Sequence, residues 1–205
     1  MKTHHFLLFL SLLAVSCTKD RVEDVPDQRD DTTPLYPISI RAGQDTGVGI
    51  NYVDFSPDLS FNLNPYLVND SLYLDLDSDL VNDFKLVYYK SSPFQLGAIL
   101  RYLTITPLGN NQICVHPSNT NLADSLVFND PIDSTRTWSA ATALLFRYSW
   151  TQAGYSTLDG YFLGNIPYYY VGLRLTKDQH DYYGWLFLNH AGIDRFAMTR
   201  VYYEE

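Results

Sequence analysis

The sequence predicts an all-β protein, a single jelly-roll-like β-sandwich, and three observations indicate this fold class. Apolar and polar residues alternate over many short runs from residue 35 onward. Gly, Pro, Asn and Asp separate these runs and are typical of turns. The 17 Tyr, 11 Phe and 3 Trp are an aromatic load typical of strands that half-bury large side chains. A chain of 205 residues accommodates one such domain, which we place at residues 35–205.

Residues 1–16 have the features of an export signal. Ten residues, 6–15, are apolar apart from one Ser, a stretch too short to span a bilayer. The run Leu-Ala-Val-Ser-Cys at 13–17 resembles the lipobox of bacterial lipoproteins, in which the cysteine is diacylated and becomes the mature N-terminus. The resemblance implies that Cys17 anchors the chain to a membrane through its lipid. The alternative is a cleaved signal whose cut happens to lie near Cys17.

Residues 17–34 are predicted to be an acidic, disordered tether. Six acidic and three basic side chains accompany almost no large apolar residue, so the segment cannot bury enough surface to fold. Thr-Lys-Asp at 18–20 resembles the surface-export signal of some Gram-negative lipoproteins. This resemblance implies the outer membrane, with exposure on its outer face. A spacer without any address is the alternative.

The folded part of the chain is expected to be strands throughout. Turn chemistry is predicted at residues 56–58, 107–111 and 129–131. Ala residues give 139–145 some helical propensity, but we assign this region to a strand because the following residues alternate. The clearest alternating runs are residues 37–42, 48–55, 71–76, 84–90, 97–106 and 112–116.

The C-terminal third is the most aromatic part of the sequence. Residues 168–175 and 182–188 are expected to form a hairpin joined by a polar connection, and 195–203 a final strand. In the first strand, Tyr169 and Val171 are placed on a core face, with Tyr170 on the opposite face. Gly184 is expected where another chain segment packs closely.

The loop at residues 75–83 has the spacing of a calcium site. Asp75, Asp77 and Asp79 supply carboxylates at positions 1, 3 and 5, Val81 a backbone carbonyl at 7, and Asp83 a carboxylate at 9. Calcium requires six to eight oxygen ligands, and side chains at this spacing can converge on one ion. Calcium is therefore the predicted cofactor. The alternative is an acidic, solvated turn.

Two positions depart from an EF-hand. Leu80 occupies position 6, where a sharp turn favours Gly at positive φ, and a bulky residue there costs about 1 kcal/mol. Leu86 stands at position 12 in place of the bidentate Glu. The loop is therefore expected to recruit other ligands and to bind calcium weakly, with a Kd of about 10⁻⁴ to 10⁻³ M.

Several motifs resemble those of a loosely defined group of secreted, surface-anchored bacterial β-sandwich proteins. They are the Asp-rich loop, Val-Gly-Leu-Arg-Leu at 171–175, Tyr-Gly-Trp at 183–185 and Val-Tyr-Tyr-Glu at 201–204. The resemblance covers roughly residues 70–205 and implies the fold and an envelope location, but no established activity. The chain departs from the group at Leu80, where Gly is usual, and at Tyr202, where a small residue is usual.

Composition and motifs argue against catalysis and against nucleic acid. Glu occurs only at positions 23, 204 and 205, so the folded body lacks the usual carboxylate pair of a glycosidase. With a net charge of −9 and no cluster of Lys and Arg, phosphate-backbone binding is not expected. Cys114 is left without an intrachain partner if Cys17 is lipidated; we interpret it as a buried apolar residue, the alternative being a reactive thiol beside His116.

Two functions remain open at this stage. The first is a non-catalytic cell-envelope lipoprotein, a structural or interaction module that binds calcium and meets an envelope protein. The second is a carbohydrate-binding module that stacks sugars on aromatic faces. Those aromatic side chains can equally be core and strand-pairing residues. The candidate glycan-binding side chains are Tyr168, Tyr170, Tyr182 and Trp185, and Trp150 is a further aromatic residue that motivates this function.

Overall fold

The computed structural model describes residues 39–61, 68–91, 98–151, 153–160, 168–189 and 192–199. All of these belong to the compact unit Pro34–Glu205. The predicted signal peptide and tether, including Cys17, and the last residues from 200 onward lie outside the described residues. Within the described ranges every regular element is a strand, which confirms the all-β fold class. No described helix is long and apolar enough to cross a bilayer.

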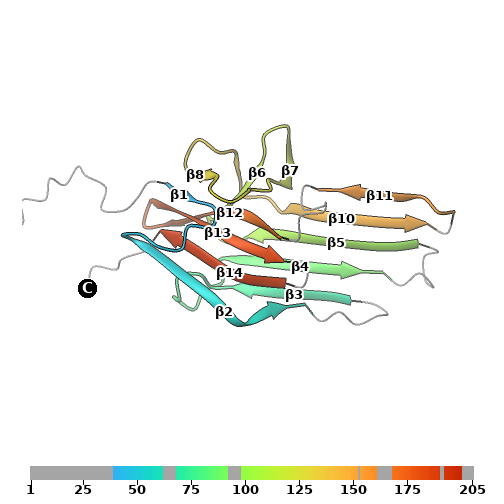
Figure 1. The fold of residues 1–205 in the computed structure, drawn as a ribbon, viewed down its shortest axis with the longest axis horizontal. Helices are drawn as coiled ribbons and strands as arrows, with labels where there is room; N and C mark the ends of the chain where they lie inside the picture. The colour runs from blue at the N-terminus through green and yellow to red at the C-terminus, as the bar shows by residue number, and fades with distance from the viewer. Residues whose placement is uncertain are drawn as a thin grey trace, which may run out of the picture. The chain divides into compact units, whose positions relative to one another are not determined.

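The strands form one long curled sheet and one small sheet. The order in the long sheet is β2-β14-β13-β12-β6-β7-β10-β5-β4-β3, with β11 beside β10 and β9 beside β6, while β1 pairs β8. The long sheet curls into a half-barrel, so that its two halves face each other in a β-sandwich-like arrangement (Figure 1). The strands are β1 Ile40–Arg41, β2 Ile50–Ser60, β3 Val68–Leu74, β4 Phe84–Lys90, β5 Ala98–Pro107, β6 Gln112–His116, β7 Asn119–Ala123, β8 Pro131–Ile132, β9 Trp138–Ser139, β10 Ala143–Thr151, β11 Ser156–Asp159, β12 Tyr168–Lys177, β13 His180–Asn189 and β14 Gly192–Thr199.

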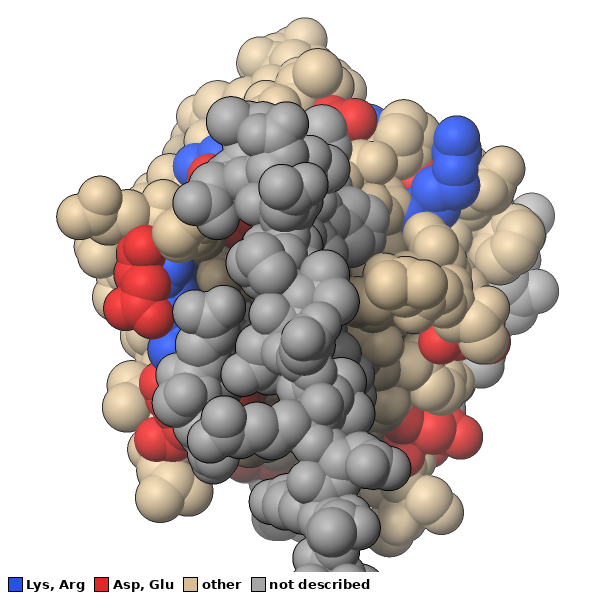
Figure 2. All heavy atoms as spheres, turned by 90° about the vertical axis from the view of Figure 1, so that its left-hand side faces the viewer, with Lys and Arg blue, Asp and Glu red and all other residues tan. Residues whose placement is uncertain are grey.

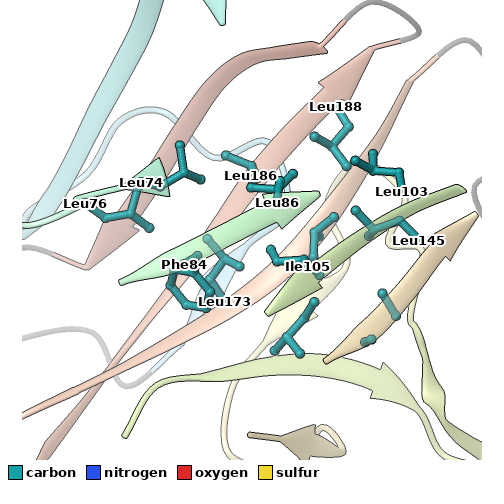
Figure 3. Close-up of a cluster of buried hydrophobic side chains, with 14 of the residues drawn as sticks. Leu74, Leu76, Phe84, Leu86, Leu103, Ile105, Leu145, Leu173, Leu186 and Leu188 are labelled. Carbon is teal, nitrogen blue, oxygen red and sulfur yellow. The ribbon is translucent and has the colours of Figure 1, made fainter. Parts of the chain in front are cut away.

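A leucine-rich core lies between the two halves of the long sheet. Leu86 and Ile105 point inward from the half that contains β3, β4, β5 and β10, and Leu173 and Leu186 face them from β12 and β13 (Figure 3). All four side chains are almost completely removed from solvent. This burial is a main driving force for closing the two halves on each other.

A second core covers the other face of β12 and β13. It contains Tyr170, Tyr183, Trp185 and Phe187 and is completed by Ile40, Ala42, Cys114, Leu126 and Ile132. The expectation of one core face in this hairpin was therefore incomplete, because the small sheet of β1 and β8 buries the face that carries Tyr170. A close approach in this hairpin lies at Gly172, where an added Cβ would come within 2.9 Å of the Cβ of Cys114.

Two predicted turns differ in their outcome. The turn at residues 129–131 is present, with Asn129 at φ 74°. The turn predicted at residues 56–58 is instead an irregularity inside β2, because the register shifts between Asp54 opposite Arg195 and Leu59 opposite Ile193. Residues 139–145 contain no helix, but the strand assignment holds only in part: residue 139 ends β9 and 143–145 begin β10, whereas residues 140–142 between them are not strand.

Candidate metal centre

The loop that joins β3 to β4 brings three of the predicted carboxylates together. One carboxylate oxygen from each of Asp75, Asp77 and Asp83 lies within 4.8 Å of the others. Two oxygens on opposite sides of a calcium ion, each at 2.3–2.6 Å, are about 4.6–5.2 Å apart, so this spacing fits ligands of one ion. The cluster could therefore hold a metal ion.

Backbone amides of the loop hold these carboxylates in place. The amide of Leu80 donates a 2.9 Å hydrogen bond to Oδ2 of Asp75. The amide of Asp79 donates a 3.2 Å bond to Oδ1 of Asp77. Such short-range bonds are what aspartates in turns commonly make, and here they fold the loop back on itself.

Asp83 anchors the loop to the core. Its Oδ2 accepts a 2.7 Å bond from the amide of Leu76, and its Oδ1 accepts a 3.1 Å bond from Nδ2 of Asn111. Asn111 in turn accepts a 3.1 Å bond from the amide of Thr176 in β12. The sequence identified Asn111 only as a turn residue, because nothing local indicates that it joins the loop to β12.

Burial raises the pKa of Asp83 to about 6. The negative charges of Asp77 and Asp75 add to this effect, while the hydrogen bonds from Leu76 and Asn111 oppose it. A carboxylate that is buried beside other carboxylates is costly to ionise, and a divalent cation placed among them would remove much of that cost.

Lys177, at the end of β12, is a residue of this centre that sequence reasoning missed. Its Nζ donates a 2.6 Å bond to Oδ2 of Asp77 and a 3.2 Å bond to Oδ2 of Asp79. Burial alone would lower the pKa of Lys177, but the bonds to the two aspartates raise it. The ammonium therefore supplies one positive charge to the loop from a residue 100 positions away.

Asp79 and Val81 occupy different places from the carboxylate trio. Oδ1 of Asp79 accepts a 2.8 Å bond from the amide of Val81, and this bond together with Lys177 lowers the pKa of Asp79. Both residues line a hollow of about 160 Å³ that also touches Asp77 and Asp83. Asp79 thus shares the ammonium of Lys177 with Asp77 but is not grouped with the carboxylate trio.

Oδ1 of Asp75 is a polar atom of the loop that no described residue satisfies. It is buried, and none of the residues in the described ranges gives it a hydrogen bond. A buried carboxylate oxygen without a donor is unfavourable unless a cation or another donor meets it. This atom belongs to the same carboxylate that joins the trio.

The backbone at Leu80 has the conformation that the loop spacing predicted. Leu80 adopts φ 69°, and Ser78 adopts φ 63°, both in the left-handed region that favours Gly. The Leu80 side chain is 94% exposed, so packing does not compensate for the strain. The turn is therefore formed at an energetic cost.

The aromatic side chains proposed for sugar binding are mostly core residues. Tyr170, Tyr182 and Trp185 are buried, so their rings do not offer faces to a sugar. The reason is that both faces of the β12–β13 hairpin are covered. The side chain of Tyr168 lies outside what the structure describes.

Cys114 has the environment of a packing residue. It is fully buried, and burial raises the pKa of its thiol to about 12, with Asp124 adding to the shift and Arg136 opposing it. A thiol in this state is protonated at neutral pH and is a poor nucleophile.

Comparisons with known proteins add no family or relative. No family model, no curated protein and no solved structure matches the chain.

Charge on the surface follows the acidic composition: in the view of Figure 2, acidic side chains form several separate groups and basic ones are fewer.

Proposed function

We propose that the protein is a non-catalytic, lipid-anchored module of the bacterial cell envelope whose loop at residues 75–83 binds calcium. Cys17 would carry the lipid, the acidic tether would separate the β-sandwich from the outer membrane, and the folded body would meet an envelope or extracellular partner. The lipobox-like run at 13–17 and the absence of Glu from residues 35–203 support this proposal.

The observation that carries the calcium assignment is the unsatisfied Oδ1 of Asp75 within the carboxylate trio. All three side chains offer hard oxygen ligands, which suit calcium or magnesium rather than zinc. Calcium is favoured over magnesium because an irregular loop is better suited to its flexible geometry than to a strict octahedron. Bound calcium would join the loop between β3 and β4 to the core through Asp83.

The test is a thermal melt of the protein with millimolar calcium, with millimolar magnesium and with chelator. We expect calcium to raise the Tm by several degrees, and magnesium to raise it less. Asp75→Asn should abolish the calcium effect. Asp79→Asn, a matched change in the same loop, should retain it because Asp79 is outside the trio. An equal Tm in calcium and chelator would contradict the proposal, as would a calcium effect that survives Asp75→Asn.

A further inference from the structure

A shallow hollow lies at the opposite end of β5 from the aspartate loop. Its lining residues are Ile99 and Arg101 from β5 and Tyr148 and Trp150 from β10, and its volume is about 520 Å³. Figure 1 shows the ends of β5 and β10 extending beyond the described ends of β12 and β13. The volume is within the range of small-molecule sites.

The strand register explains why these side chains share one face. Trp150 lies opposite Ile99, and Tyr148 opposite Arg101, so each pair points to the same side of the sheet. The next pair along is Phe146 with Leu103, which packs in or against the leucine-rich core. The hollow is therefore a continuation of the core-facing surface, and aromatic rings remain half-buried on it.

Arg101 is a cation in this hollow that pairs with no carboxylate of the described residues. Its Nε is buried and receives no acceptor within the described ranges. Nε of Arg174 is in the same state, but Arg174, like Arg41, Arg136 and Arg147, contacts a carboxylate or carbonyl oxygen through another guanidinium nitrogen. A guanidinium that is half-buried and unpaired is unusual, because its donors lose water without gaining acceptors.

A second cation increases the positive charge at the same place. Lys90 of β4 lies directly opposite Arg101, so both side chains are on the face of the hollow. Like charges in direct cross-strand pairs are destabilising. The salt bridges of the described part of the chain involve Lys177, Arg136, Arg147 and Arg174 and leave this pair without a carboxylate.

We infer that this hollow binds an acidic saccharide. The carboxylate of a sugar acid would pair with the guanidinium of Arg101, which is shaped for bidentate contact with a carboxylate. The ring of the sugar would lie against Trp150 and Tyr148, whose faces are apolar while their edges can form hydrogen bonds. Lys90 would add attraction for the anion. This site is separate from the aspartate loop and does not depend on its metal.

The test is isothermal titration of the full chain in detergent with trigalacturonic acid, in calcium-free buffer because calcium binds uronates. The fully methyl-esterified trisaccharide is the matched neutral ligand. We expect the acid to bind at least tenfold more tightly than the ester, since a charge-assisted pair is lost in the ester. Absence of binding by the acid up to about 10 mM would overturn the inference, as would equal affinity for the two ligands.

Variants locate the site. Arg101→Gln should weaken binding of the acid about tenfold or more. It breaks no ion pair between described residues, so the fold should be retained. Arg147→Gln is the control: it removes the same charge from an exposed position of β10 that is paired with Asp159. If both variants weakened binding of the acid equally, the effect would come from net charge alone, and the assignment of the site to this hollow would be overturned. Quenching of Trp150 fluorescence by the acid, lost in Trp150→Phe, provides an independent readout of contact with the ring.

Discussion

The two ends of strands β3, β4 and β5 carry opposite charges, and they differ in whether those charges have hydrogen-bonding partners in the protein. At one end, Asp75, Asp77 and Asp83 are held by backbone amides, by Asn111 and by Lys177. At the other end, Lys90 and Arg101 are adjacent, and no described carboxylate pairs with them. A charge held by fixed partners contributes mainly to the stability of the fold, whereas an unpaired charge remains available to a ligand.

The largest effect is expected from Asp83→Ala at the aspartate end. The change leaves the amide of Leu76 without its acceptor, and it removes one of the two acceptors of Asn111 Nδ2, the other being the backbone carbonyl of Asp83. A buried donor that loses its acceptor costs about 1–3 kcal/mol. We expect the free energy of unfolding to fall by about 3 kcal/mol, measured by denaturant titration. Asp159→Ala, which breaks an exposed ion pair with Arg147, should cost less than about 1 kcal/mol. A similar loss of unfolding free energy in the two variants would contradict the distinction between a buried, hydrogen-bonded carboxylate and an exposed one.

The pH dependence of stability should also separate Asp83 from other carboxylates. Its pKa of about 6 in the folded state is above the ordinary 3.8, so folding favours the protonated form. The stabilising contribution is therefore present below pH 3.8 and is lost as the pH rises through 6. In chelator, the free energy of unfolding of Asp83→Asn relative to the wild type should rise between pH 4 and 7, by on the order of 2 kcal/mol.

The measurement is the free energy of unfolding of each protein at each pH, and the wild-type value is subtracted from that of Asp83→Asn. The subtraction cancels the contributions of the other carboxylates, which titrate in both proteins. Calcium should reduce the difference, because it binds the ionised carboxylate of Asp83 more strongly than the neutral amide of Asn. A difference that stays constant between pH 4 and 7 would contradict a raised pKa for Asp83.

Matched lysine substitutions compare the two ends directly. Lys177→Met leaves Asp77, whose side chain is only 3% exposed, without its cation. In chelator we expect a loss of about 1 kcal/mol, and a larger stabilisation on adding calcium because a competing cation is gone. Lys90→Met should cause no loss, since it relieves repulsion with Arg101. A greater loss for Lys90→Met than for Lys177→Met would reverse the comparison.

The smallest effect is expected from Leu80→Gly, which sharpens the account of the loop itself. Gly accepts φ 69° without strain, and the exposed Leu side chain contributes little packing. The greater freedom of Gly in the unfolded chain offsets part of the gain, so we expect a stabilisation of about 0.5 kcal/mol. Val81→Gly, an adjacent exposed position without positive φ, should destabilise instead.

Strand positions were largely predictable because they depend on local alternation. The predictions for residues 84–90 and 112–116 coincide with β4 and β6. Alternation could not show that both faces of β12 and β13 are covered, since burial of the second face depends on β1 and β8, which lie far away in the sequence. For this reason Tyr170 and Trp185 were open to interpretation as binding residues although they belong to the core.

The sequence by itself determined the all-β class, the aspartate spacing of residues 75–83 and the conflict at Leu80, because each depends on neighbouring residues along one backbone. The tertiary structure decided which carboxylates converge, since it groups Asp75 and Asp77 with Asp83, leaves Asp79 outside that group, and brings Lys177 to both Asp77 and Asp79. It also decided the surroundings of Arg101, because the cross-strand register places Lys90 beside it and no carboxylate of the described residues pairs with it. Contacts between residues far apart in the chain follow from sheet topology, which local patterns do not specify.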